Sequence, residues 1–65
     1  MPTLQLTVPK DDLNADEKAE LIDRLTDTVS EFYQKEQDED IRDFVNVQIT
    51  ETADTGYAVG GTIIG

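Results

Sequence analysis

Thr-Leu-Gln-Leu-Thr-Val, residues 3–8, alternates polar and apolar side chains, the pattern of a β-strand that buries one face. Pro9 follows, and because proline has no N–H to donate to a neighbouring strand, it predicts the end of this one. A second stretch, Phe-Val-Asn-Val-Gln-Ile-Thr, alternates in the same way and predicts another strand over residues 44–50. These two stretches decide the fold.

A long amphipathic helix is predicted between the two strands. Asn14 precedes it as an N-cap, and Glu17, three residues on, completes the sequence of a capping box. Apolar residues then recur at spacings of three and four as far as about Gln34, which gives the helix one apolar face: Leu21, Ile22, Leu25, Val29, Phe32 and Tyr33. The acidic segment 36–43 is expected to connect the helix to the second strand.

Strand, helix and strand in this order define a βαβ unit, whose two strands are expected to be parallel. Residues 52–56 predict a turn, and Gly60-Gly61 predicts a bend in the short apolar segment 57–64, which makes a C-terminal hairpin. We therefore predict the α+β class and a single domain over residues 1–65. One helix covers only one face of a two-stranded sheet and leaves its edges open, so this fold requires completion by oligomerisation.

The composition leaves association between copies as the main source of additional stability. The chain has 65 residues, too few for a large core, and contains neither cysteine nor histidine. Disulfides, thiolate metal sites and the commonest metal ligand are therefore excluded, and no metal or cofactor is expected. The acidic run at residues 38–40 is interpreted as a solvated loop because its spacing matches no calcium-binding loop.

The chain is strongly acidic, with fifteen Asp and Glu against five Lys and Arg and a formal net charge of −10. Such a surface repels nucleic acid and anionic membranes, so neither is expected as a partner. A cationic partner, solubility or life in concentrated salt could each explain the acidity. We favour a halophilic origin, because molar salt screens the self-repulsion of carboxylates spread along the whole chain.

Two further patterns bear on location. No apolar run reaches the roughly 20 residues of a membrane span. No basic and apolar signal-peptide pattern precedes the first strand. A cytoplasmic location is therefore expected.

Pro2 is the residue that most favours a chemical function. Met1 precedes a small residue and is expected to be removed in the cell, which turns the Pro2 nitrogen from an amide into a secondary amine. An α-amino group titrates at about 7.7–8.0, close enough to neutrality to act as a general base once an apolar pocket lowers its pKa. Aspartates and glutamates are too abundant and too scattered to indicate a site.

The chain resembles the 4-oxalocrotonate tautomerase family over essentially its whole length. The resemblance is carried by the Met1-Pro2 start, the Val-x-Val-x-Ile-x-Glu strand of residues 45–51 and the aromatic-x-x-Gly-Gly pattern of residues 57–61. It implies βαβ units that pair into four-stranded sheets and assemble as homo-oligomers, with a trimer of dimers as the expected hexamer. It also implies an isomerase that interconverts the keto and enol forms of a small α-keto or enol acid, without a cofactor.

The resemblance also implies roles for individual residues. Pro2 would be the catalytic base, and Tyr57 would line the substrate pocket, often from a neighbouring subunit, and help keep the proline amine neutral. Two arginines that hold the substrate in the family's best-studied members fall at Leu13 and Asn46 here, and neither position is cationic.

Lys10 and Arg42 are the nearest cationic residues and are the candidates for substrate binding in place of those arginines, Lys10 as a point charge without a guanidinium fork. Asn46 can donate a hydrogen bond to an oxyanion but brings no charge. The absence of the arginines also favours the protonated form of the Pro2 amine. A monoacid or another enol is therefore expected as substrate in preference to a dicarboxylate.

Two alternatives remain beside the enzyme. The chain could be a family member without activity that serves as an oligomeric scaffold, or an acidic module that binds a basic protein. Activity that depends on a free Pro2 terminus distinguishes the enzyme from the scaffold. A tight, salt-sensitive complex with a basic partner would favour the acidic module.

Overall fold

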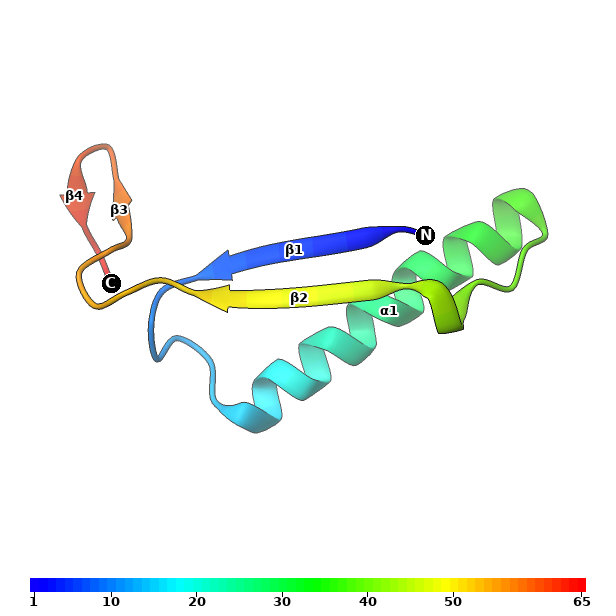
Figure 1. The fold of residues 1–65 in the computed structure, drawn as a ribbon, viewed down its shortest axis with the longest axis horizontal. Helices are drawn as coiled ribbons and strands as arrows, with labels where there is room; N and C mark the ends of the chain where they lie inside the picture. Colours follow the sequence, from blue (N-terminus) through cyan, green and yellow to red (C-terminus); the bar gives the residue numbers. More distant parts are fainter.

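The computed structural model describes residues 1–65 and places one long helix behind a sheet of two strands, with a small hairpin at one end (Figure 1). The elements follow the chain in the order β1 (Thr3–Val8), α1 (Ala15–Gln37), the 3-10 turn η1 (Arg42–Phe44), β2 (Asn46–Glu51), β3 (Ala58–Val59) and β4 (Thr62–Ile63). Strands β1 and β2 are parallel, and β3 and β4 form an antiparallel pair. The predicted α+β class, the βαβ unit and the C-terminal hairpin are confirmed.

The register of the parallel pair places apolar residues opposite one another on one face. Leu4 lies opposite Val47, and Leu6 lies opposite Ile49. All four are half-buried, whereas their neighbours along each strand are exposed, and Val8 at the end of β1 is buried. This alternation confirms the period of two predicted from the sequence, and it identifies the face that α1 covers.

The other face of the sheet is polar and open. Gln5 and Gln48 lie opposite one another, and Gln5 Nε2 donates a hydrogen bond of 3.2 Å to Gln48 Oε1. The remaining exposed positions of this face carry uncharged hydroxyl or amide side chains: Thr3, Thr7, Asn46 and Thr50. A hydrogen bond between side-chain amides on neighbouring strands stabilises their pairing, even where no helix or second sheet packs on this face.

The helix begins where the sequence predicts. Asn14 Oδ1 accepts a 2.8 Å hydrogen bond from the backbone N–H of Glu17, and Glu17 Oε1 accepts one of 3.0 Å from the N–H of Asn14, which completes the capping box. The helix continues past the predicted end near Gln34 to Gln37 and stops at Asp38, which adopts φ +52°. The apolar periodicity ends earlier because the last residues of α1 are polar residues that favour helix without facing the sheet.

The second strand begins two residues later than predicted. The N–H of Phe44 donates to the carbonyl of Ile41 at 2.8 Å, and the N–H of Val45 donates to that of Arg42 at 3.2 Å, so the chain makes a 3-10 turn before β2. Phe44 is exposed, Val45 is half-buried and Asn46 is exposed, so the alternation of the strand already begins in the turn. An alternating sequence pattern therefore cannot distinguish this turn from the start of a strand.

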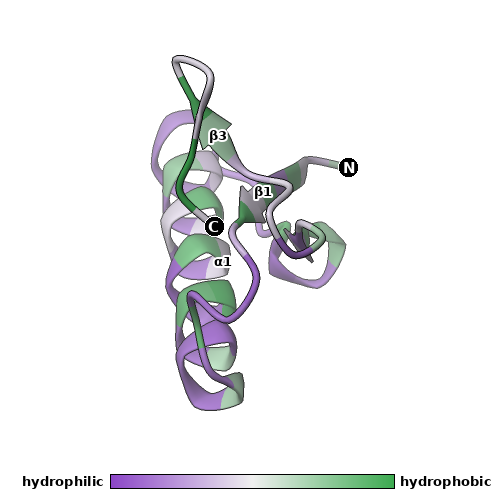
Figure 2. Cartoon of the chain, turned by 90° about the vertical axis from the view of Figure 1, so that its left-hand side faces the viewer, coloured by the Kyte–Doolittle hydropathy of each residue, from purple (hydrophilic) through white to green (hydrophobic).

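The predicted apolar face of α1 is divided in the structure. Leu21, Leu25, Val29 and Tyr33 are half-buried toward the sheet, whereas Ile22 is 37% exposed and Phe32 is 58% exposed. Figure 2 shows α1 lying to one side of the strands, with hydrophobic and hydrophilic residues alternating along it. No helix of the chain combines the length and the apolar character needed to cross a lipid bilayer.

A single chain has almost no interior. Val8, at 8% exposure, is the only buried residue, and the accessible surface is 4926 Å², against about 4100 Å² for a compact monomer of this mass. The radius of gyration is 14.7 Å, against about 11 Å for a compact chain of this length. The large apolar residues that remain exposed are Met1, Ile22, Phe32, Phe44, Val59, Ile63 and Ile64. This surface agrees with the expectation that other copies complete the fold.

The C-terminal hairpin is the most exposed apolar part of the chain. Gly60 and Gly61 connect its strands with φ values of +58° and +85°, the conformation of a two-residue turn that glycine adopts without strain. Val59 and Ile63 are 61% and 60% exposed, and the hairpin projects from one end of the sheet (Figure 1). An isolated two-stranded hairpin is marginal in water, so this one requires a surface to pack against.

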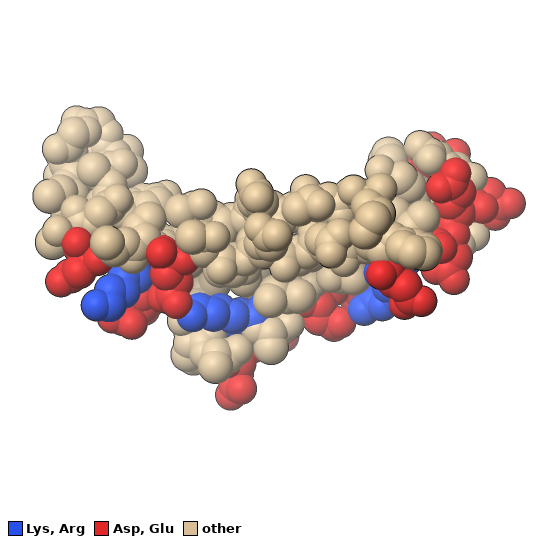
Figure 3. Space-filling view, in the orientation of Figure 1, with Lys and Arg blue, Asp and Glu red and all other residues tan.

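Charge is nearly absent from the strands, where only Glu51, the last residue of β2, carries it. All twenty charged side chains lie in residues 10–43 or at Glu51 and Asp54, whereas segments 1–9, 44–50 and 55–65 have none. In Figure 3 acidic and basic residues follow the lower border and one tip of the molecule, and the broad surface facing the viewer is uncharged. The edges of β1 and β2 and the hairpin therefore offer a contact surface on which copies of a −10 chain meet few carboxylates.

Asn14→Ala removes the side-chain acceptor of the capping box and should lower the free energy of unfolding by about 1 kcal/mol. Urea unfolding at a fixed chain concentration measures the effect, since association contributes to stability. Asp12→Ala, in the preceding turn, is the matched control and should change stability by less than about 0.5 kcal/mol. Equal unfolding midpoints for Asn14→Ala and the unmodified chain would contradict the role of the cap.

Candidate functional site

Pro2 lies at the end of the parallel sheet where β1 and β2 both begin. It directly precedes β1, is half-buried, and its carbonyl oxygen accepts a 3.0 Å hydrogen bond from the backbone N–H of Asn46. Thr3 lies opposite Asn46 in the register, so the first residues of β1 and β2 are side by side. Met1 is 87% exposed beyond the sheet, which leaves the Met1–Pro2 bond accessible for cleavage.

The side chain of Asn46, whose backbone N–H bonds Pro2, is polar and neutral. Asn46 Nδ2 donates a 3.3 Å hydrogen bond to the carbonyl oxygen of Phe44, so the turn η1 orients this amide. The Phe44 side chain is 54% exposed at the same end of β2. Pro2 and Asn46 are thus two of the predicted site residues that the fold brings together within one chain.

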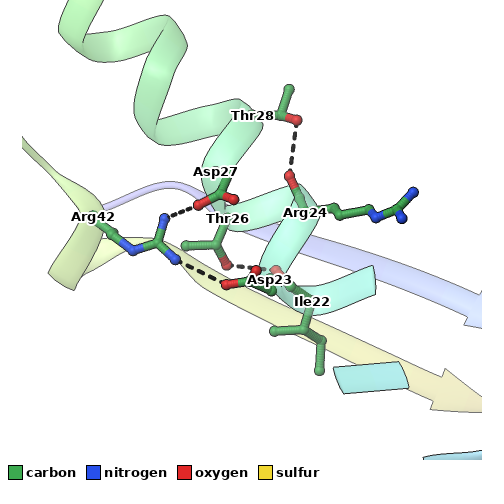
Figure 4. Close-up of polar contacts among 7 residues, drawn as sticks. All are labelled: Ile22, Asp23, Arg24, Thr26, Asp27, Thr28 and Arg42. Atoms are coloured by element: carbon green, nitrogen blue, oxygen red, sulfur yellow. Dashed lines mark hydrogen bonds and ion pairs between the residues drawn. The ribbon is translucent and has the colours of Figure 1, made fainter. Parts of the chain in front are cut away.

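Arg42 belongs to the same end of the molecule, but its guanidinium is engaged with the helix. It forms ion pairs with two carboxylates one helical turn apart, to Asp27 through Nη1 and to Asp23 Oδ1 through Nη2 at 3.1 Å (Figure 4). The hydrogen bond that Arg42 donates to Asp27 and the negative charge of that carboxylate, with those of Asp23, raise the pKa of Arg42 further. Arg42 is therefore permanently charged, and its charge is balanced by α1.

Lys10 and Tyr57 lie at the opposite end of the sheet. Pro9 and the six residues of β1 separate Lys10 from Pro2, and the strand alone spans about 20 Å at about 3.3 Å per residue. Tyr57 begins the hairpin, where its carbonyl accepts a 2.8 Å hydrogen bond from the N–H of Ile64. Neither residue can reach Pro2 of its own chain, so any site that combines them contains residues of two chains.

Lys10 lines an open hollow of about 670 Å³ at this opposite end, together with Asp11, Glu51, Thr52, Ala53 and Asp54. Lys18 of α1 forms an ion pair with Glu51, and the backbone N–H of Asp11 donates to Glu51 Oε2 at 3.0 Å. The hydrogen bond from Lys18 and that from Asp11 lower the pKa of Glu51 below its usual 4.5. This network ties the start of the helix to the end of β2.

The ionic partners at either end of the sheet were not predicted from the sequence. Asp23 and Asp27 are four residues apart on one helix face, a spacing that could have indicated a shared cationic partner. Nothing in the sequence pairs Lys18 with Glu51, which are 33 residues apart. No three acidic side chains converge in a way that would hold a metal ion.

These features define a class of protein: a small βαβ chain in which a proline at the start of the first strand lies beside the start of the second. The family model described as Tautomerase enzyme matches residues 2–65, and the chain therefore belongs to the tautomerase family. No curated protein and no solved structure matches the chain significantly. Members of the family act on small-molecule substrates and form oligomers, and membership supports tautomerase-type isomerase activity.

Glu51→Gln should lower stability at neutral pH, because it removes the carboxylate that joins Lys18 to the backbone of Asp11. The folded-state pKa of Glu51 is lowered, so the contribution is complete above the unfolded value of 4.5 and disappears as pH falls through the folded value. Thermal unfolding temperatures of Glu51→Gln and the unmodified chain should therefore differ at pH 7, and the difference should shrink as the pH falls below 4.5. A difference that persisted unchanged at pH 3 would contradict the assignment.

Proposed function

We propose that this chain is a tautomerase in which the amine of Pro2, exposed when Met1 is removed, is the general base. The observation that carries the proposal is the position of Pro2. It is half-buried at the end of the sheet where both strands begin, beside Asn46, and an exposed Met1 precedes it. Membership of a family of tautomerase enzymes supports a catalytic role for a secondary amine at this position.

The proposed reaction moves one proton and no other group. As an enol ketonises, its O–H bond breaks, the carbonyl forms, and the electron pair of the C=C bond takes up a proton at carbon. The Pro2 amine accepts a proton in one half of this exchange and returns it in the other, so it is regenerated. Asn46 lies beside it as a neutral donor for the negative charge that develops on oxygen.

The charge around the site bears on the substrate. Arg42 is engaged with Asp23 and Asp27, and Asn46 is uncharged, so one chain presents no free guanidinium fork beside Pro2. A substrate with two carboxylates would find no matching pair of cations there. We therefore propose an α-keto or enol acid with a single carboxylate, for which Lys10 of a neighbouring copy is the available point charge.

Pairing between copies would complete the site. If the uncharged outer edges of two β1 strands pair antiparallel about a two-fold axis, Pro2 of one copy lies near Lys10 of the other, because these residues flank the strand. The exposed hairpins, with Tyr57 at their base, would then pack between such dimers and shield the amine. This arrangement supports a homo-oligomer built from dimers, with a hexamer as the expected state.

Pro2→Ala should reduce the rate of ketonisation at least about a hundredfold, because a positioned general base contributes a factor of that order. Intact mass must first show that Met1 is absent, and the assay uses phenylpyruvate and a 2-hydroxydienoate in low and molar salt. Thr28→Ala, on the exposed side of α1, is the control and should retain full activity. Equal activity of Pro2→Ala and the unmodified chain would overturn the assignment.

The second candidate function is an oligomeric scaffold without activity. It is favoured by one observation, that the only arginine near Pro2 is bound to α1. A chain with a free proline terminus, intact assembly and no turnover of either substrate would support the scaffold. An acidic module for a basic protein would instead be indicated by a tight complex that molar salt dissociates.

Ile63→Glu should dissociate the assembly, because it places a charge on the uncharged hairpin surface of a chain that already carries −10. Ala19→Glu adds the same charge to the exposed surface of α1 and is the matched control. Sedimentation in dilute and in molar salt measures the size of the oligomer. Molar salt should favour the oligomer, because it shortens the range of repulsion between like charges to about 3 Å. A monomer under all conditions, or an Ile63→Glu chain that assembles normally, would contradict the proposed surface.

A further inference from the structure

We infer that Arg42 is a positioning residue for the Pro2 site, acting through η1 to hold the start of β2 against Pro2, and that it does not bind substrate. The inference rests on the proposed function of Pro2. It assigns Arg42 a task that the sequence alone left open, since its place before β2 made it a candidate for substrate binding.

The contacts of Arg42 form a clamp between η1 and α1. One planar guanidinium bonds two carboxylates on successive turns of the helix, Asp23 and Asp27 (Figure 4). The guanidinium is planar and rigid, and both of its terminal nitrogens are bonded. It therefore restrains the backbone of Arg42 more strongly than a single ammonium group would. The clamp therefore determines where η1 lies along the helix.

The same residue closes the turn that leads into β2. The carbonyl oxygen of Arg42 accepts the N–H of Val45 at 3.2 Å, and the next residue, Asn46, donates its N–H to Pro2 at 3.0 Å. The Asn46 side chain in turn donates to the carbonyl of Phe44 within η1. A continuous series of contacts thus runs from α1 through Arg42 to the backbone and side chain of Asn46, and from there to Pro2.

The surrounding charge explains why this clamp is needed. Residues 36–43 contain five carboxylates, and Arg42 is the only cation among them. Without it, this acidic segment would face Asp23 and Asp27 on the helix with no compensating charge, and like charges would push η1 away from α1. The ion pairs of Arg42 with Asp23 and Asp27 therefore hold η1 against α1, at the end of the sheet where Pro2 lies.

Substrate binding by Arg42 would require this arrangement to open. Both of its terminal nitrogens already bond carboxylates, and a substrate carboxylate would have to displace at least one of them. Asp23 and Asp27 are part of the same chain and are always present at high effective concentration, whereas a substrate is not. The geometry therefore favours the clamp over the ligand.

The test compares Arg42→Gln with the double variant Asp23→Asn/Asp27→Asn, which removes the same clamp from the other side. In both, amide hydrogen exchange at Asn46 should be at least roughly fivefold faster. The rate constant kcat should fall roughly tenfold for phenylpyruvate and for its uncharged ethyl ester alike, with KM within about twofold of the original. Arg42→Lys should restore only part of the loss, because lysine lacks the fork.

Combination and control variants sharpen the comparison. Adding Arg42→Gln to the double variant should cause no further loss, since both act on one interaction. Arg24→Gln, which breaks the exposed pair with Glu20 on the same helix, should leave both exchange at Asn46 and kcat unchanged.

A rise in KM for phenylpyruvate alone would show that Arg42 binds the substrate and would overturn the inference. Full activity in Asp23→Asn/Asp27→Asn would show that the clamp is not needed for catalysis and would overturn it too. Unchanged exchange at Asn46 in Arg42→Gln would overturn it as well. Exchange requires no turnover, so it decides the role of the clamp even if Pro2 proves not to be a base. Loss of activity in Pro2→Ala with normal exchange at Asn46 would, conversely, support the proposed function independently of Arg42.

Discussion

A single layer of half-buried aliphatic side chains, between α1 and one face of the β1–β2 pair, holds this chain together. Only Val8 is buried, at 8% exposure, and the hairpin and both sheet edges contribute apolar surface that the chain itself does not cover. The free energy available from so little burial is small for 65 residues. The proposed assembly, and with it the proposed site, therefore depends on the apolar surface that the chain leaves uncovered.

The distribution of charge follows from that dependence. A net charge of −10 opposes association, yet the strands and the hairpin have no charged side chain within segments 1–9, 44–50 and 55–65. Carboxylates are concentrated on α1 and its connections, where water and salt can solvate them. The chain can thus be highly acidic and still present surfaces that bury without leaving unpaired charges, which would be costly at an interface.

The same separation shapes the candidate site. Pro2 and Asn46 meet on the uncharged side of the molecule, whereas the nearest guanidinium, that of Arg42, is turned toward the acidic helix. The strand residues beside Pro2, Thr3 and Asn46, are therefore uncharged, and the cation Lys10 and the ring of Tyr57 lie at the other end of a strand about 20 Å long. Joining the two ends requires antiparallel neighbours, so the proposed activity and the proposed assembly have a common geometric basis.

Local patterns were sufficient to predict β1, the capping box at Asn14, the glycine turn of the hairpin and the position of Pro2, because each depends on residues close together in the chain. They could not locate the start of β2, since a 3-10 turn and a strand share the alternation of Phe44 to Asn46. Nor could they show which cation is free, because the partners of Arg42 lie 15 and 19 residues away. Tertiary structure alone decided these points, since packing brings distant charges together and the sequence does not encode those pairings locally.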